Sequence, residues 1–111
     1  MAVTPKVLIL AKIAEAVQTT QYTATNVRAI VDKFTATNFG TTTEMLSVNV
    51  IGVSSGAGNQ NLIVKTKALQ PSESYTFPEV VGHVLNSGDF ISTLASSGNN
   101  INIRVSGREI S

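Results

Sequence analysis

The chain has 111 residues, which is room for one domain with one modest hydrophobic core. Charged residues make up 14% of the chain, against a usual share of about 25%, and the net charge is +1. The lysines and arginines are scattered along the sequence, so we expect no nucleic-acid partner. The absence of cysteine excludes a disulfide scaffold, a zinc–cysteine site and a thiol nucleophile.

Residues 1–18 differ in pattern from the rest of the chain. The run from Val7 to Leu10 is continuously apolar, whereas Leu10 and Ile13 are separated by a helical interval. Pro5 excludes a helix interior around it. Two alternatives are therefore open: a short amphipathic helix that closes one end of the domain, or an extended arm that docks on a neighbouring subunit. The candidate protein-interaction residues of this segment are Val7, Leu8, Ile9, Leu10 and Ile13.

The same apolar run is too short to cross a membrane. Lys12 and Glu15 interrupt it far short of the roughly 20 residues that a spanning helix needs. We therefore expect no membrane association.

Strand patterns begin at residue 19. Residues 19–25 are rich in Thr and Tyr and predict a first strand. Residues 27–37 carry apolar side chains first at odd and then at even positions. This change predicts a long central strand with a bulge that shifts its register. The stretch that starts at Asn38 has turn chemistry and leads to residues 44–53, which we expect to pair with the preceding strand.

The clearest local signal is a β-hairpin in the middle of the chain. Within residues 44–53, Leu46, Val48 and Val50 alternate with polar residues, the period of a half-buried strand. A loop rich in Gly and Asn follows, and residues 62–67 run back as the second strand.

The last third of the chain predicts short elements. Residues 75–77 form a short strand that ends at Pro78, and residues 78–85 predict one or two helical turns. Residues 90–95 and 101–106 predict a second hairpin. Short strands separated by turn signals indicate an all-β fold, a two-sheet antiparallel β-sandwich of jelly-roll or immunoglobulin-like type. The sandwich domain is expected to span residues 19–111.

The residues that could support catalysis do not form a recognisable motif. His83 is the only histidine, and a hydrolytic triad would need it to meet a nucleophilic serine and a carboxylate such as Asp89. No residue pattern marks such a serine. The Gly-rich loop at residues 52–59 lacks the Lys-Ser/Thr and the following helix of a phosphate-binding loop. We expect no enzymatic activity and no cofactor.

Metal and glycan binding are equally weakly supported. Glu73, Glu79 and Asp89 do not have the spacing of a calcium loop, so we expect no metal site. Aromatic residues are only 5% of the chain and there is no tryptophan. The four aromatics that could stack on sugars or bases are better explained as core residues: Tyr22, Phe39, Tyr75 and Phe77.

The C-terminal two-thirds of the chain resembles small virion proteins of tailed bacteriophages. The resemblance runs through residues 61–65, 69–85, 88–92 and 104–110. Its pattern is a strand, the turn Pro71-Ser72-Glu73, then Tyr75-Thr76, an apolar helix led by Pro78, and Gly88-Asp89 at the start of the next strand. In size and pattern the chain is similar to the capsid decoration, or cement, proteins of epsilon-fifteen-like short-tailed phages.

The resemblance implies a non-enzymatic structural role. It predicts a protein made in the host cytoplasm that binds the outer surface of the assembled capsid and clamps neighbouring major capsid proteins, as a homodimer. Two alternatives are a small tail or receptor-contacting virion protein and a carbohydrate-binding β-sandwich module. The pattern includes no catalytic motif, so it supports the family more than the position in the virion.

Overall fold

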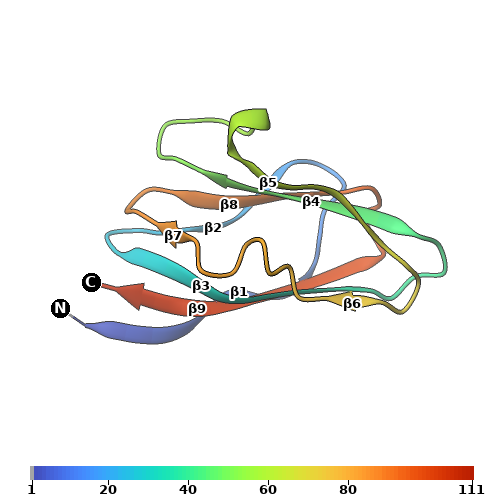
Figure 1. Cartoon of the computed structure of the whole chain (residues 1–111), viewed down its shortest axis with the longest axis horizontal. Helices are drawn as coiled ribbons and strands as arrows, with labels where there is room; N and C mark the ends of the chain where they lie inside the picture. The colour runs from blue at the N-terminus through green and yellow to red at the C-terminus, as the bar shows by residue number, and fades with distance from the viewer. Residues whose placement is uncertain (1) are drawn as a thin grey trace.

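The structure, a computed structural model, describes residues 2–111 and places its strands in two antiparallel sheets (Figure 1). The strands are β1 Val3–Ile13, β2 Thr19–Thr23, β3 Arg28–Asn38, β4 Glu44–Ile51, β5 Leu62–Leu69, β6 Ser74–Tyr75, β7 Val84–Leu85, β8 Phe90–Ala95 and β9 Ile101–Ile110. A single 3-10 turn, η1, covers Asn59–Asn61. The all-β sandwich predicted from the sequence is confirmed.

The two sheets have the strand order of a jelly roll. One sheet runs β1-β9-β3-β6, with β7 also paired to β3, and the other runs β2-β8-β4-β5. If β6 and β7 are counted as two parts of one interrupted strand, the pairs β4–β5, β3–β6/β7, β2–β8 and β1–β9 are nested like the rungs of one long hairpin. Rolling that hairpin up adds the pairs β3–β9 and β4–β8. This is jelly-roll topology, so the immunoglobulin-like alternative is excluded.

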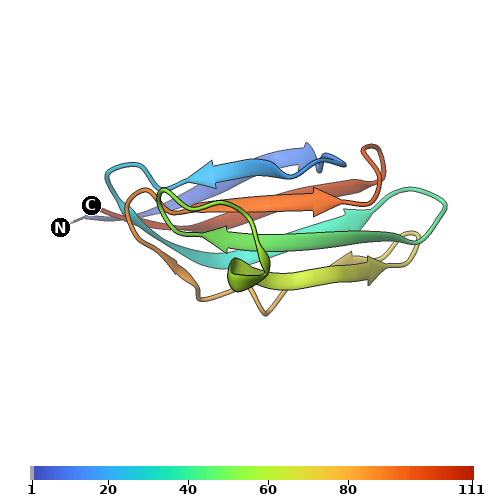
Figure 2. The same cartoon turned by 90° about the horizontal axis from the view of Figure 1, so that it is seen from above.

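Figures 1 and 2 show the sandwich from the side and from above, respectively, and locate its edges. The Cα envelope measures 45 × 26 × 19 Å. Because Figure 1 looks down the shortest axis and shows the sheets one above the other, the broad sides of the sandwich, loops included, extend over 45 by 19 Å. β1 lies at the edge of the five-stranded sheet and both chain ends lie at one end of the sandwich.

Two predicted strand pairings are wrong. The hairpin β4–β5 forms as expected, but β3 and β4 belong to different sheets, and so do β8 and β9. The connections between them cross from one sheet to the other at the end of the sandwich. Alternation identifies the face of each strand that is buried, but it does not identify the neighbouring strand, because the apolar face of β9 complements β3 as well as it would complement β8.

Residues 2–18 form neither of the structures predicted for residues 1–18, of which residue 1 lies outside the described part of the chain. Residues 3–13 are the strand β1, which pairs antiparallel with β9 of the same chain, and residues 14–18 connect β1 to β2. The extended conformation expected of an arm is present, but the segment is an edge strand of the sandwich itself. The domain boundary expected at residue 18 therefore does not separate a detached segment from the core.

The short helix predicted for residues 78–85 is also absent; this segment is a series of turns that ends in β7. Phe77 has a φ of 41° and Gly82 a φ of 90°, both outside the helical region. The amide of Gly82 donates to the carbonyl of Val31 over 2.7 Å, so the segment is bonded to β3 in addition to its own turn bonds, such as that from the amide of His83 to the carbonyl of Val80. Phe77, Val80 and Leu85 are consequently fully buried.

The core between the sheets is built from the alternating strands as expected. β9 contributes Ile101, Ile103 and Val105, and β4 contributes Leu46 and Val48, all with no measurable exposure. The core includes an aromatic cluster, with the ring centroids of Phe34 and Phe77 5.0 Å apart and those of Tyr75 and Phe77 4.8 Å apart.

One buried polar residue, Asn38, organises the loop between β3 and β4. The side-chain amide of Asn38, which is fully buried, donates to the carbonyls of Thr42 and Leu69 over 2.8 and 2.9 Å. Its side-chain oxygen accepts a hydrogen bond from the amide of Gly40. Asn38 thereby fastens the β3–β4 loop to the end of β5.

Candidate protein-interaction surface

The apolar residues proposed as an interaction site all lie on β1, where the structure divides them into two groups. Leu8 and Ile9 are only 7% and 3% exposed and belong to the chain's own core. Leu10 and Ile13 are 75% and 44% exposed, and Val7 is half-buried. The chain itself therefore covers half of the apolar run and leaves the other half accessible.

Two irregularities in the pairing of β1 with β9 cause this division. The first lies between Val7 and Ile9 and makes Leu8 an extra residue on β1, so that Leu8 and Ile9 both face the core. The second lies between Ile9 and Lys12, which pair with Val105 and Ile103 of β9. β1 therefore has one more residue than β9 in this interval. Leu10 falls in this second irregularity and points away from the core. The continuous apolar run from Val7 to Leu10 is therefore explained by bulges in an edge strand, which place consecutive residues on the same face.

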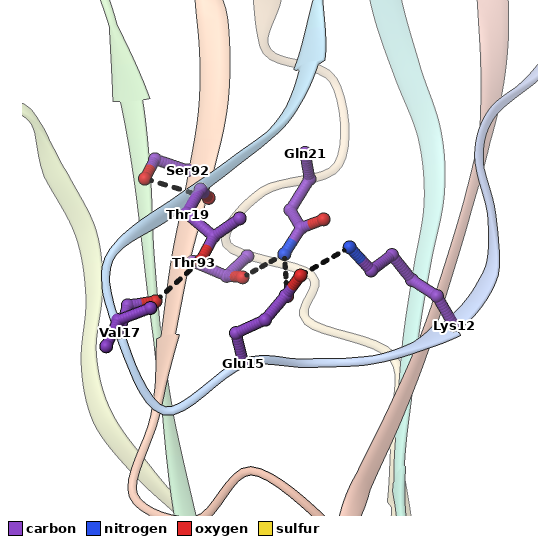
Figure 3. A network of polar contacts seen from close by, with 7 residues as sticks. All are labelled: Lys12, Glu15, Val17, Thr19, Gln21, Ser92 and Thr93. Carbon is purple, nitrogen blue, oxygen red and sulfur yellow. Dashed lines mark hydrogen bonds and ion pairs between the residues drawn. The ribbon is translucent and has the colours of Figure 1, made fainter.

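A polar network holds the end of β1 in place (Figure 3). The carboxylate of Glu15 accepts hydrogen bonds from Lys12 Nζ and Gln21 Nε2, both over 2.8 Å. Gln21 Nε2 also donates to Thr93 Oγ1 over 3.0 Å, which links the β1–β2 connection to β8. The bonds from Lys12 and then Gln21 hold the pKa of Glu15 below its usual range.

A second network joins the two sheets at the end where the chain termini lie. The hydroxyl of Tyr22 donates to Glu109 Oε2 over 2.5 Å, and Lys6 Nζ lies 3.3 Å from Glu109 Oε1. The bond from Tyr22, and to a lesser degree Lys6, lowers the pKa of Glu109, while burial and then Glu109 raise the pKa of Tyr22. β1 is thus fixed at both ends, and Leu10 lies on a strand held to its own sheet.

The outer face of the five-stranded sheet collects half of the basic residues of the chain. Four of the eight lysines and arginines project from it: Arg28 and Lys33 on β3, and Arg104 and Arg108 on β9. Register places Arg104 opposite Thr35, Lys33 opposite Ser106, Arg108 opposite Ile30 and Arg28 opposite Ile110. The four cations therefore alternate between the two strands in a zigzag. We call this surface the basic face.

Among the described residues, Asp32 is the one carboxylate on the basic face. It accepts a two-pronged hydrogen bond from Arg108, with Arg108 Nη2 2.9 Å from Asp32 Oδ1 and Arg108 Nε 3.0 Å from Asp32 Oδ2. Arg28, Lys33 and Arg104 form no ion pair within residues 2–111. The face carries a net charge of +3 (four cations less one carboxylate), whereas the whole chain carries +1.

Apolar side chains border the basic face on both sides. Register with the outward-facing residues of β9 places Val3, Val7 and Ile13 of β1 on this face. On the opposite border, Val84 of β7 lies opposite Ile30 and is 52% exposed. A shallow depression of about 410 Å³ lies between β1 and β3 and is lined by Pro5, Lys6, Val7, Asp32, Ser106 and Gly107.

The outer face of the other sheet has a different character. A groove of about 270 Å³ runs over it beside the β4–β5 loop. Asn49 Nδ2 donates to Asn61 Oδ1 over 2.7 Å, and Ser92 Oγ accepts from Gln18 Nε2 over 2.7 Å. Throughout the described chain no buried side-chain nitrogen or oxygen lacks a hydrogen-bond partner. The buried polar groups beneath this groove, such as those of Asn49 and Ser92, are therefore satisfied within the chain.

The candidate catalytic and metal-binding residues are dispersed. His83 is exposed in the turn before β7. Glu73 accepts a bond from the amide of Gln70, Glu79 from the hydroxyl of Tyr75, and Asp89 from the amides of Val53 and Asn86. Within residues 2–111 no three such side chains are grouped so that they could hold a metal ion.

The candidate stacking residues do not share a surface. Tyr22 and Phe77 are buried in the core, and Lys67 Nζ lies over the ring of Tyr75, 4.4 Å from its centroid. Phe39 is 53% exposed in the β3–β4 loop. The Gly-rich loop that precedes η1 is closed by Asn61, which donates to the carbonyl of Gly56.

Over the part of the chain that the structure covers, no helix could span a bilayer. Compared with protein-family models, curated proteins and solved structures, the chain matches none. Its function must therefore be inferred from its own surface.

Proposed function

We propose that the chain is a non-enzymatic structural protein of a bacteriophage virion, which binds the outer surface of the assembled capsid and clamps neighbouring major capsid proteins. The observation that supports this proposal is the edge strand β1, on which Leu10 is 75% and Ile13 44% exposed. Large apolar side chains beside the unpaired edge of a sheet are features that partner proteins cover.

The rigidity of β1 favours a binding role. The networks around Glu15 and Glu109 fix both ends of the strand, so little conformational entropy is lost when Leu10 and Ile13 are covered. The exposed apolar residues are therefore presented on a preorganised surface.

Such a protein would stabilise the capsid by mass action. A protein that binds only the assembled shell stabilises it by RT ln(1 + [L]/Kd) at each site, where L is the free protein. A homodimer would engage two neighbouring capsid subunits at once and so gain from the high effective concentration of its second half. Light scattering on the purified chain tests the dimer, whose expected mass is twice that of one chain.

The experiment that tests the virion position is a measurement of copy number. Purified particles are separated on a stained gel, and the band of this chain is compared with that of the major capsid protein. Capsid binding predicts hundreds of copies per particle and density for the jelly roll on the outer shell in a cryo-EM map. A handful of copies with density on the tail would support the tail or receptor-contacting alternative instead, and absence from the particle would reject both.

A carbohydrate-binding module remains the third proposal and has less support. Sugar stacking needs exposed aromatic rings. The rings of Tyr22 and Phe77 are buried, and Lys67 covers the ring of Tyr75. A glycan array with the wild-type chain addresses this alternative directly, and specific binding lost on Phe39→Ala would favour it.

A further inference from the structure

We propose that the basic face is the surface through which the chain docks, and that its partner is an acidic protein surface with apolar side chains beside its carboxylates. This proposal rests on the proposed function in taking the capsid exterior as that partner. It goes further by assigning the face, the chemistry of the contact and the residues that contribute most to it.

Charge complementarity identifies the partner as acidic. All three arginines of the chain, together with Lys33, project from this one face, and three of these four cations form no ion pair within residues 2–111. Six of the seven acidic residues lie elsewhere, namely Glu15, Glu44, Glu73, Glu79, Asp89 and Glu109. Opposite charges across an interface speed the encounter and fix the orientation of the partners.

The apolar borders favour a protein over a nucleic acid. Val7 and Ile13 on one side and Val84 on the other would contact a partner that approaches the cations. A phosphate backbone offers these side chains no apolar surface, and a net charge of +3 is small for a nucleic-acid site. An acidic protein surface can pair its carboxylates with the cations and cover the valine and isoleucine side chains with apolar side chains of its own.

The geometry of the face suits a protein interface. The face bears a shallow depression, and the 45 by 19 Å side of the sandwich has room for a standard interface, which buries roughly 800 Å² on each partner. Arg28, Lys33 and Arg104 project from paired strands of the sheet, so their backbone positions are fixed before binding. Arginine is enriched among residues that dominate binding energy because its planar group bonds carboxylates in pairs.

The test uses the full chain and two charge reversals on this face, Lys33→Glu and Arg104→Glu. The two reversals are made singly and together, and the matched control for each single reversal is Lys65→Glu, which makes the same charge change at an exposed position of β5 on the other sheet. Melting curves first establish that all variants are folded. The probe is a random copolymer of glutamate and leucine, and the readouts are its affinity and the backbone amide NMR shifts that it perturbs.

The expected result is that the probe perturbs amides of β3 and β9 and that Lys33→Glu and Arg104→Glu each weaken binding by about fivefold or more, with Lys65→Glu within about twofold of wild type. The double reversal should weaken binding by more than either single reversal. Raising the salt concentration should weaken wild-type binding and leave the double reversal nearly unaffected. Shifts centred on β4, β5 or β8, or equal losses in the single reversals and in Lys65→Glu, would overturn the assignment of the face, as would no measurable binding at low salt. Tighter binding to a 20-base-pair DNA duplex than to the copolymer would overturn the assignment of a protein partner.

A second measurement separates this inference from the proposed function. The same variants are added to capsid shells from which this chain has been removed. If wild type binds shells and the double reversal does not, both proposals hold; if both bind equally, the face is wrong and the function stands. If copolymer binding maps to the basic face but wild type does not bind shells, the face stands and the capsid function fails.

Discussion

The side chain of Leu8 lies over Gly107, so that a Cβ on residue 107 would come within 2.8 Å of Leu8 Cδ1. The same Cβ would also collide with the carbonyl oxygen of Ile30 on β3. β1 thus packs against β9 at a point where β9 has no side chain, and the inward bulge of β1 fills the space.

This packing predicts that Gly107→Ala destabilises the fold. The added methyl group meets backbone on one side and a core leucine on the other, and overpacking of this kind costs about 1–3 kcal/mol. The control is Gly56→Ala in the β4–β5 loop, where a Cβ has nothing within 4 Å. Urea unfolding of both variants measures the difference, and equal midpoints would contradict the described contact.

Truncation of Leu8 and of Leu10 should have opposite consequences. Leu8→Ala empties a buried site and should cost about 2–4 kcal/mol of unfolding free energy, whereas Leu10→Ala should change it by less than about 0.5 kcal/mol. Conversely, Leu10→Ala should weaken attachment to capsids. Thermal melts and capsid co-sedimentation test the pair; a stable Leu8→Ala variant would mean that β1 is the detachable arm considered from the sequence.

Deletion of residues 2–13 should prevent folding. It removes β1, and with it the cover of β9 and the contributions of Leu8 and Ile9 to the core. Circular dichroism and proton NMR of the truncated chain test this outcome. A truncated chain with dispersed amide signals would show that the sandwich is complete without β1.

The Tyr22–Glu109–Lys6 network predicts a loss of stability in acid. The pKa of Glu109 is lower in the folded chain, so its contribution is fully present above the unfolded-state pKa of about 4.3 and disappears as the pH falls through the folded value. Unfolding free energies should therefore fall less between pH 6 and pH 3 in Glu109→Gln and in Tyr22→Phe than in wild type. Glu15 and Glu44 also have lowered pKa values, so part of the acid sensitivity should remain. Identical pH profiles in all three proteins would reject the role of Glu109.

Asn38 should be among the least replaceable polar residues. Asn38→Ala leaves the carbonyls of Thr42 and Leu69 and the amide of Gly40 without their partner, which should cost at least about 2 kcal/mol. Asn102→Ala, at an exposed position of β9, is the control and should be nearly neutral. Comparable melting temperatures for the two variants would show that water replaces the lost bonds.

The positions of the long strands could be predicted from the sequence because alternation is a local property. β9 keeps one apolar parity, and its buried residues follow it, whereas in β4 the polar Ser47 and Asn49 are buried as well as Leu46 and Val48. Pairing could not be predicted in the same way: β3 meets β9 from the other end of the chain, and nothing local distinguishes that partner from β4. The turns at 78–85 were mistaken for a helix because the bonds that decide their conformation, such as Gly82 to Val31, are also non-local.

The candidate surface could be predicted only in part, for a related reason. The apolar run at Val7–Leu10 was visible, but its division between Leu8 and Leu10 depends on bulges that only pairing with β9 reveals. The basic face was missed altogether, since Arg28 and Lys33 stand more than seventy residues from Arg104 in sequence. Basic residues that look scattered along a chain are brought onto one surface when the strands that carry them become neighbours.

The nested pairing of the strands has a kinetic consequence. The β4–β5 pair closes a short loop, and every further pair, outward to β1–β9, encloses all the pairs within it. Each step outward starts from ends that the previous step has already brought together, whereas direct closure of β1 onto β9 would carry the entropy cost of a loop almost as long as the chain. We therefore expect folding to proceed from the middle of the sequence outward, on the millisecond-to-second scale of proteins dominated by non-local contacts. β1 acquires its partner last, and until then its apolar run is the part of the chain most exposed to mispairing and aggregation.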